Sequence, residues 1–265
     1  MKRSSTTPIH TVSDIAQSRL AGQLAARVLQ MLVPHVRAGV STNELDRLCH
    51  DYIVDELGCI PANIGYHGYT KTICASVNHV VCHGIPSDRE VLKDGDIVNV
   101  DVALIKDGWF GDTSRMYVVG EPRAQARRLV RTAYEAMRAG IQAVRPGATL
   151  GDVGHAIESV ARRERFTVVQ EYCGHGIGQI YHDTPDVLNY GVPGQGLKLE
   201  PGMIFTIEPM LNAGKAATRE LSDGWTVITN DKSLSAQWEH MVCVTETGYE
   251  VLTAWPEGTG DYPAI

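Results

Sequence analysis

The sequence predicts an α+β fold, in which helices cover one face of a curved antiparallel sheet. Each half of the chain first shows apolar residues at helical spacing and then short, β-branched apolar runs separated by turn residues. Two motifs also recur. The segment 39–45 is similar in type to 147–153, at an offset of 108, and an acid follows a glycine by six positions along an apolar run, from Gly95 to Asp101 and again from Gly202 to Glu208, at an offset of 107. Two matches at nearly the same offset favour a duplicated unit. We therefore expect one domain, residues 1–265, built from two pseudo-symmetric halves at about 12–120 and 122–254.

The first half begins with a helix. Residues 1–10 are expected to form a loose arm, and the helix follows from about Ser13, with apolar residues every four positions from Leu20 to Leu32. Gly39 ends this region.

A second helix is predicted after Ser41, which forms a capping box with Glu44, and it stops near Gly58. A loop over 61–69 and a strand over about 70–77 complete this part of the chain.

The centre of the first half is a predicted β-hairpin. Two apolar, β-branched runs, 97–105 and 116–119, flank Asp107-Gly108, a dipeptide that favours a two-residue turn because both positions tolerate positive φ. The hairpin places residues of one strand opposite residues of the other. Its pairing register therefore determines which side chains of the two strands lie on the same face of the sheet.

With that turn, Asp101 lies opposite Ser114, and Asp112 lies opposite Ala103. Side chains alternate along a strand, so the two aspartates are diagonal neighbours on one face, roughly 7–8 Å apart. Two converging carboxylates are costly to bury without a cation between them, which indicates a divalent metal. The alternative is that both aspartates lie on a solvated face of the sheet.

The second half repeats the plan. Pro122 is predicted to be the first residue of a helix, Pro146-Gly147 breaks the chain, and Thr149 with Asp152 caps the next helix. Strands are then expected at 166–172, 203–208, 225–229, 237–245 and 249–254.

Composition excludes several classes of protein. The net charge is −7 with no basic cluster, so nucleic acid is not expected as a partner. No apolar run approaches the length of a membrane span, and the N-terminus lacks the apolar core of a secretory signal. The six cysteines include no C-x-x-C pair, which favours a reduced, cytoplasmic chain over a disulfide framework or a zinc ribbon.

Three further residues are candidates for metal ligands. His175 lies in the glycine-rich turn 173–178, Glu208 ends an apolar strand, and Glu239 begins another. Each has a simpler interpretation on its own: a hydrogen-bonded turn histidine, a helix cap, or an exposed strand residue. Their occurrence together with the two hairpin aspartates favours a metal site.

The charges suit two ions. The site would contain one neutral imidazole and four carboxylates, Asp101, Asp112, Glu208 and Glu239. Two dications bring this set to neutrality, whereas without a cation the carboxylates would repel one another. Mostly oxygen ligands suit Mn²⁺, Fe²⁺ or Co²⁺ better than a structural zinc. Paired metals that share a water are typical of hydrolases.

Seven motifs carry a resemblance to a known family. VCHGIP, NVDV, GDTSRM, CGHGIG, FTIEPM, GWTVIT and SAQWEH together resemble the type I methionine aminopeptidases, colinearly over about residues 12–254. The resemblance implies the pseudo-two-fold "pita-bread" fold, with two divalent metal ions (Co, Mn or Fe) on its concave face. It also implies a cytoplasmic enzyme that removes the initiator methionine from nascent polypeptides with a small second residue. We expect a monomer that acts on nascent chains, and the sequence identifies neither the oligomeric state nor any contact with the ribosome.

The resemblance also assigns the site residues. By motif, Asp101 would bind one metal, His175 and Glu208 the other, and Asp112 and Glu239 both.

His83 and His182 fall on the two catalytic histidines of the family. Glu208 would accept the proton of the attacking water, His182 would stabilise the oxyanion, and His83 would stabilise the leaving nitrogen.

The resemblance also places a pocket for the methionine side chain. Its walls would be formed by Tyr66, His67, Tyr69, Cys74, Tyr181 and Trp225, together with the two catalytic histidines. The family often has Cys at the position of Asn63 and Phe at the position of Tyr181, so the details of this pocket stay open.

Two alternatives remain at this point. A prolidase or aminopeptidase P would share the fold and ligands but is expected to carry a large extra N-terminal domain, and only about ten residues precede the first predicted helix here. An inactive relative that serves as a binding module would be expected to lack ligands, and all five ligand positions are filled. The absence of a zinc-binding extension and of the type II insertion favours a short, bacterial-type enzyme.

Overall fold

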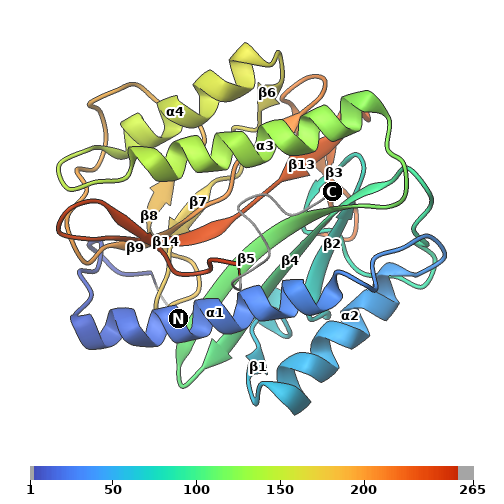
Figure 1. The fold of residues 1–265 in the computed structure, drawn as a ribbon, viewed down its shortest axis with the longest axis horizontal. Helices are drawn as coiled ribbons and strands as arrows, with labels where there is room; N and C mark the ends of the chain where they lie inside the picture. The colour runs from blue at the N-terminus through green and yellow to red at the C-terminus, as the bar shows by residue number, and fades with distance from the viewer. Residues whose placement is uncertain (1–2, 256–265) are drawn as a thin grey trace.

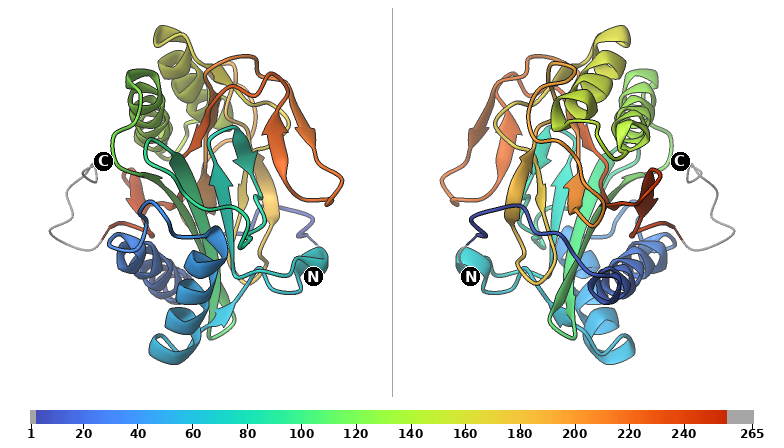
Figure 2. Two further views of the ribbon diagram at one scale, coloured as in Figure 1. Left: turned by 90° about the vertical axis from the view of Figure 1, so that its right-hand side faces the viewer. Right: turned by 90° about the vertical axis from the view of Figure 1, so that its left-hand side faces the viewer.

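The computed structural model describes residues 3–255. The helices lie on one side of the strands, as two pairs (Figures 1 and 2). The first pair is α1 (Val12–Leu32) with α2 (Thr42–Asp51), and the second is α3 (Ala124–Ala143) with α4 (Leu150–Arg163). A π-helical turn, η1 (Tyr52–Glu56), extends α2, and η2 (Tyr66–Gly68) is a short 3₁₀ turn.

The strands of the first half are β1 (Ile60–Pro61), β2 (Ile73–Val77), β3 (Val80–Cys82), β4 (Ile97–Lys106) and β5 (Trp109–Val118). The strands of the second half are β6 (Thr167–Val168), β7 (Gly174–Gly176), β8 (Asp183–Val187), β9 (Ile204–Ile207), β10 (Met210–Asn212), β11 (Thr218–Glu220), β12 (Val227–Thr229), β13 (Ser235–Gln237), β14 (His240–Val244) and β15 (Tyr249–Val251). Every pairing between described strands is antiparallel.

Two sheets position the site. In the first half β5 pairs with β4 along one edge, and β2 and β1 pair with successive stretches of its other edge. In the second half the order is β15-β14-β9-β7-β8. Two smaller sheets, β13-β10-β6 and β11-β12-β3, complete the strand layer, and the second of them joins the two halves of the chain. The predicted α+β class, with helices on one face of antiparallel sheets, is confirmed.

The predicted hairpin is confirmed in its turn and in its register. Asp107 and Gly108 have φ of 49° and 85°, as the two-residue turn requires. Asp101 pairs with Ser114, and Asp112 pairs with Ala103. Strand β5 begins at Trp109, seven residues earlier than the apolar run alone indicated, because polar residues continue the ladder.

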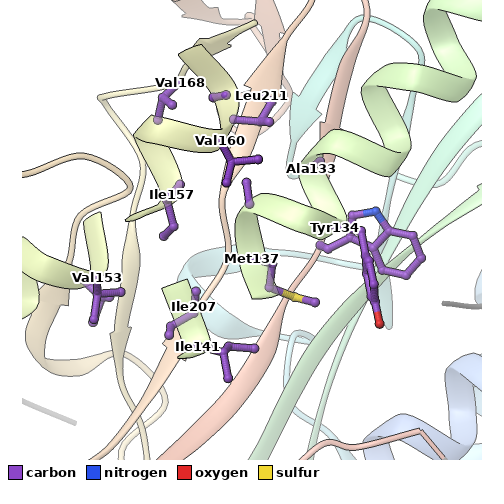
Figure 3. Close-up of a cluster of buried hydrophobic side chains, with 14 of the residues drawn as sticks. Ala133, Tyr134, Met137, Ile141, Val153, Ile157, Val160, Val168, Ile207 and Leu211 are labelled. Atoms are coloured by element: carbon purple, nitrogen blue, oxygen red, sulfur yellow. The ribbon is translucent and has the colours of Figure 1, made fainter. Parts of the chain in front are cut away.

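Each helix pair covers its own core. Under α1 and α2, Leu24, Leu45 and Val100 belong to one buried cluster with β2, β4 and β5. Under α3 and α4, Met137, Ile157 and other side chains meet the second-half strands (Figure 3). A fully buried aliphatic side chain of this kind contributes about 1.5–3 kcal/mol. The apolar faces of the strands are thereby directed toward the helices, and the opposite faces remain for a site.

Helix ends are mostly where the sequence predicts them. Thr11 and Thr149 each form a capping box, and the Ser41 hydroxyl accepts a hydrogen bond from the Glu44 backbone N–H. The predicted helix start at Pro122 is wrong: Arg123 is still extended (φ −60°, ψ 148°), so α3 begins at Ala124.

The N-terminal arm is not loose over its described part. The Arg3 Nη2 donates to the Asp183 carbonyl at 2.8 Å and to Asp186 Oδ1 at 2.7 Å. The Ser4 N–H donates to Asp183 Oδ1 at 2.6 Å. These bonds attach the arm to β8, where the sequence suggested no partner for it.

Strand prediction was weaker in the second half. The run 166–172 forms only the two-residue β6, and the run 237–245 is two strands, β13 and β14, separated by Trp238 and Glu239. Within residues 3–255, the model has no helix that combines the length and the apolarity needed to cross a membrane.

Candidate metal centre

One cavity of about 390 Å³ holds the entire predicted site. Its lining includes Tyr66, His67, Tyr69, Cys74, His83, Asp101, Asp112, His175, Tyr181, His182, Glu208, Trp225 and Glu239. These residues come from both halves of the chain and from seven stretches that are remote in sequence. The structure therefore brings together every residue that the motifs assigned to the site.

Alternation along the strands explains why the ligands reach this cavity. In β9, Phe205 and Ile207 are buried in the core under α3 and α4, so Thr206 and the following Glu208 face the other way. Likewise, Val100 and Val102 pack beneath α1 and α2, and Asp101 between them lines the cavity.

Glu239 reaches the cavity from the break between β13 and β14. Its neighbour Trp238 is fully buried under α3, where its indole N–H donates to the Val130 carbonyl at 3.0 Å. The buried indole fixes the chain at this break, and the Thr113 hydroxyl donates to the Glu239 carbonyl at 2.7 Å.

The candidate ligand atoms converge. Ligand atoms of Asp112, His175 and Glu239 all lie within 4.8 Å of one another, and the three residues are buried. His175 Nε2 lies 3.4 Å from Asp112 Oδ2 and 3.6 Å from Glu208 Oε1. These separations are longer than charge-assisted hydrogen bonds and are compatible with a shared cation.

His175 is oriented by its own backbone neighbourhood. Its Nδ1 lies 3.0 Å from the Gly176 carbonyl, which can only accept a hydrogen bond, so Nδ1 carries the proton. The lone pair of Nε2 then faces the carboxylates, as a metal ligand requires. The His175 backbone N–H donates to Thr206 Oγ1 at 2.9 Å.

Glu208 is held at both oxygens. Thr206 Oγ1 donates to Oε1 at 2.8 Å, and Gln237 Nε2 donates to Oε2 at 3.2 Å. Burial, strengthened by Asp112 and opposed by His175, raises the pKa of Glu208 to about 7. The carboxyl group can therefore change its protonation state near neutral pH.

Asp101 shows the fit to a cation most directly. Its Oδ1 is buried, and no described residue donates a hydrogen bond to it. Burial, together with Asp112 and Glu208, raises the pKa of Asp101 well above its usual range. Burial and the same two neighbours also raise the pKa of Glu239. This donor set, which is rich in carboxylate oxygen and self-repelling on its own, suits hard or borderline divalent cations.

The two predicted catalytic histidines lie beside this cluster as neutral imidazoles. Burial and the neighbouring His175 lower the pKa of His182 to about 2, and burial lowers the pKa of His83. The Tyr66 hydroxyl lies 2.7 Å from His182 Nδ1. His83 has a φ of 56° and lies edge-on to Trp225, with ring centroids 5.9 Å apart.

Aromatic rings form one side of the cavity. Tyr181 stacks on Phe110 with centroids 5.1 Å apart, and Tyr66 meets the Tyr181 ring at 5.0 Å. Tyr69 meets Trp225 edge-on at 4.9 Å. This arrangement provides an apolar, polarisable pocket beside the carboxylates.

The motif analysis missed several lining residues: Cys82, Glu171, Tyr172, Cys173, Met210 and Gln237. All of them lie within four residues of a predicted site residue, so adjacency in sequence was the available signal. Two of them contact a predicted site residue: Gln237 donates a hydrogen bond to Glu208, and Tyr172 packs edge-on against His83.

Known proteins resemble this chain in sequence over nearly its whole length. Residues 16–246 match the model of metallopeptidase family M24. A curated relative named methionine aminopeptidase from Salmonella typhimurium is 54% identical over 257 residues, which cover 97% of each chain. A relative of the same name from Rickettsia prowazekii is 53% identical over 259 residues, covering 97% of this chain and 99% of its own.

Solved structures agree as well. The methionine aminopeptidase from Rickettsia prowazekii superposes with a TM-score of 0.92 at 53% identity, covering 94% of this chain and all of its own. A prolidase from Pyrococcus furiosus, at 21% identity and a TM-score of 0.74, shares the fold, and the match covers 65% of that chain. The chain described here belongs to metallopeptidase family M24.

Proposed function

We propose that this chain is a dimetal aminopeptidase that removes the N-terminal methionine from polypeptides whose second residue is small. The observation that carries the proposal is one cavity in which four carboxylates and an imidazole converge next to an aromatic pocket. Near-full-length relatives at 53–54% identity carry the name methionine aminopeptidase, which supports the same activity.

Five residues would hold two divalent ions of Co, Mn or Fe. We assign Asp101 to one ion, His175 and Glu208 to the other, and Asp112 and Glu239 to both. When bound, such ions supply Lewis acidity and make a water nucleophilic at neutral pH.

The chain's own residues perform the proton transfers and stabilise charge. Glu208, whose carboxylate is held in place by Thr206 and Gln237, accepts the proton of the attacking water. His182 is neutral and donates a hydrogen bond to the oxygen on which negative charge develops, and His83 stabilises the leaving amide nitrogen. The Tyr66 hydroxyl on Nδ1 of His182 leaves the Nε2–H of that ring for the substrate.

The pocket defines the substrate. The rings of Tyr66, Tyr69, Tyr181 and Trp225, with the sulfur of Cys74, favour an unbranched thioether side chain over the branched leucine. We propose that the second residue of the substrate lies beside the ligands and His83, and that this part of the cavity admits only small side chains. We propose that the substrates are nascent chains at the ribosome and that the enzyme acts as a cytoplasmic monomer.

A peptide series tests the proposal. Met-X-Gly-Gly peptides should be cleaved when X is Gly, Ala, Ser, Thr, Pro, Val or Cys, and almost not at all when X is Leu, Lys or Phe. Leu-Gly and Ala-Gly analogues should be poor substrates, since a methylene-scale mismatch in an apolar pocket is worth roughly 10–200-fold in kcat/KM. Comparable rates on Met-Ala and Met-Lys, or a preference for Leu over Met, would overturn the assignment.

A further inference from the structure

The side-chain pocket contains one polar pair among its aromatic walls. Asn63 and Tyr181 lie 118 positions apart in sequence, yet both line the cavity and both are buried, at 7% exposure each. The Tyr181 hydroxyl donates to Asn63 Oδ1 at 2.8 Å. The pair therefore joins the two halves of the chain by a hydrogen bond within the pocket wall.

The pair is anchored beyond the pocket. Asn63 Nδ2 donates to the Thr72 carbonyl at 3.0 Å, which fixes which end of the amide faces Tyr181. The backbone N–H groups of Thr72 and Ile73 donate in turn to Asp46 Oδ1 of α2, at 2.8 and 3.0 Å. Asn63 is thus held by the segment that leads into β2, and this segment is held by a helix.

The Tyr181 ring is packed against aromatic neighbours on several sides. The ring stacks on Phe110 with an interplanar angle of 9°, and it meets Tyr66 and His182 on other sides with centroids 5.0 and 4.1 Å away. A phenylalanine at this position would lack the oxygen, and a cysteine at position 63 would be shorter than the amide. The pair present here makes the pocket shorter and more polar than Cys with Phe would make it.

The amide has one hydrogen to spare. An amide nitrogen carries two hydrogens, and among residues 3–255 the acceptor found for Asn63 Nδ2 is the Thr72 carbonyl. A thioether sulfur is a weak acceptor, whereas a methylene group accepts nothing. A pocket with such a donor can distinguish methionine from norleucine, which have nearly the same shape.

We propose that the Asn63–Tyr181 pair is the specificity-determining wall of the side-chain pocket, and that it sets the length and the polarity of the first residue that the enzyme accepts. The inference rests on the proposed methionine aminopeptidase function. It predicts rejection of ethionine, which is one methylene longer than methionine, and of norleucine, which lacks the sulfur.

The experiment is a double-mutant cycle with Asn63→Cys, Tyr181→Phe and the double variant. Substrates are X-Ala-Gly-Gly peptides in which X is methionine, ethionine or norleucine, and kcat and KM are measured separately on the metal-loaded enzyme. Tyr117→Phe is the matched control: it removes a buried tyrosine hydroxyl that is bonded to the Leu29 carbonyl at 2.6 Å, and Tyr117 does not line the cavity. Melting temperatures of all variants report any loss of folding.

The wild-type enzyme should prefer methionine to ethionine by about 10–200-fold and to norleucine by a smaller factor. Each single variant leaves one buried polar group without its partner and should raise KM, and the double variant should recover much of that loss. Its preference for methionine over ethionine should fall by about tenfold or more, and Tyr117→Phe should keep the wild-type ratios.

Three outcomes contradict the inference. Unchanged substrate ratios in the double variant would show that the pair does not select the side chain. Single-variant effects that simply multiply would show that the hydrogen bond does not couple the two residues. A wild-type enzyme that cleaves no methionine peptide would contradict the proposed function itself, and the inference with it.

Discussion

The two halves of the molecule present their ligands to the cavity in different ways. In the first half, Asp101 and Asp112 lie on one regular hairpin whose geometry follows from its turn. In the second half, His175, Glu208 and Glu239 come from a three-residue strand, the end of β9 and a break between two strands.

The hydrogen bonds made to the candidate ligands also differ between the two halves. Glu208 accepts hydrogen bonds from Thr206 and Gln237, and His175 is oriented by the Gly176 carbonyl. Asp101 Oδ1, in contrast, receives no hydrogen bond from the described residues. The second half therefore holds its ligands in place by neutral donors, whereas the first half depends on bound cations to compensate a buried negative charge.

The largest effect is expected from Asp112→Asn, because this residue faces ligands of the second half across the cavity. An amide supplies one neutral oxygen instead of a charged pair, so both ions should bind weakly, and kcat/KM should fall roughly a thousandfold or more. The metal stoichiometry of the purified variant and its turnover rate measure these two effects. Asp107→Asn, in the exposed turn of the same hairpin, should leave both unchanged, and normal metal content with near-normal turnover in Asp112→Asn would disprove the bridging role.

His182→Ala should lower kcat by roughly 10²–10³-fold, the usual cost of losing one oxyanion donor. Metal content should hardly change, because His182 is not placed among the ligands. A parallel loss of metal and activity would show that the residue had been assigned to the wrong part of the site.

In the metal-free protein, the free energy of unfolding should fall as the pH rises. Burial raises the pKa of Glu208 to about 7, and the pKa values of Asp101 and Glu239 are raised by burial as well. The folded, metal-free protein therefore binds more protons than the unfolded chain, and the free energy of unfolding falls as pH rises through this window. The melting temperature of chelator-treated protein should drop by roughly 5–10 °C between pH 5 and pH 8.

Added Mn²⁺ should abolish most of that dependence, because the ions favour the ionised carboxylates. Glu208→Gln should weaken it, whereas Glu246→Gln, an exposed substitution of the same kind, should not. A chelated protein equally stable at both pH values would contradict the electrostatic description of the cluster.

Tyr66→Phe tests whether the first half supports a catalytic group of the second. Loss of the hydroxyl at 2.7 Å from His182 Nδ1 should lower kcat by roughly tenfold with a smaller change in KM, since one hydrogen bond is removed and the aromatic wall is kept. An effect on KM alone would mean that Tyr66 only shapes the pocket.

Local rules were enough to predict the first half. The Asp107-Gly108 turn determines the register of the whole hairpin, and the cap at Ser41 marks a helix start through a backbone hydrogen bond made within one turn. These interactions are short-range, so the residues that make them are visible together in the sequence.

The second half depends on contacts that no local pattern encodes. Strands β7 and β8 are short and contain glycine, proline and aspartate, so they form only because neighbouring strands supply partners. The break at Glu239 has a similar origin, because Trp238 is drawn into the core under α3. The Asn63–Tyr181 bond links residues of separate loops, and its existence could not be inferred before the fold was known.

The most direct test of a metal centre shared by both halves is an anaerobic titration of chelator-treated protein with Mn²⁺, followed by calorimetry and by cleavage of Met-Ala-Gly-Gly. We expect two ions per wild-type chain, activity that appears only with metal, and selectively weaker binding of one of the two ions in Asp101→Asn. Full turnover without metal, or an Asp101→Asn variant that binds two ions as the wild type does, would contradict the shared metal centre.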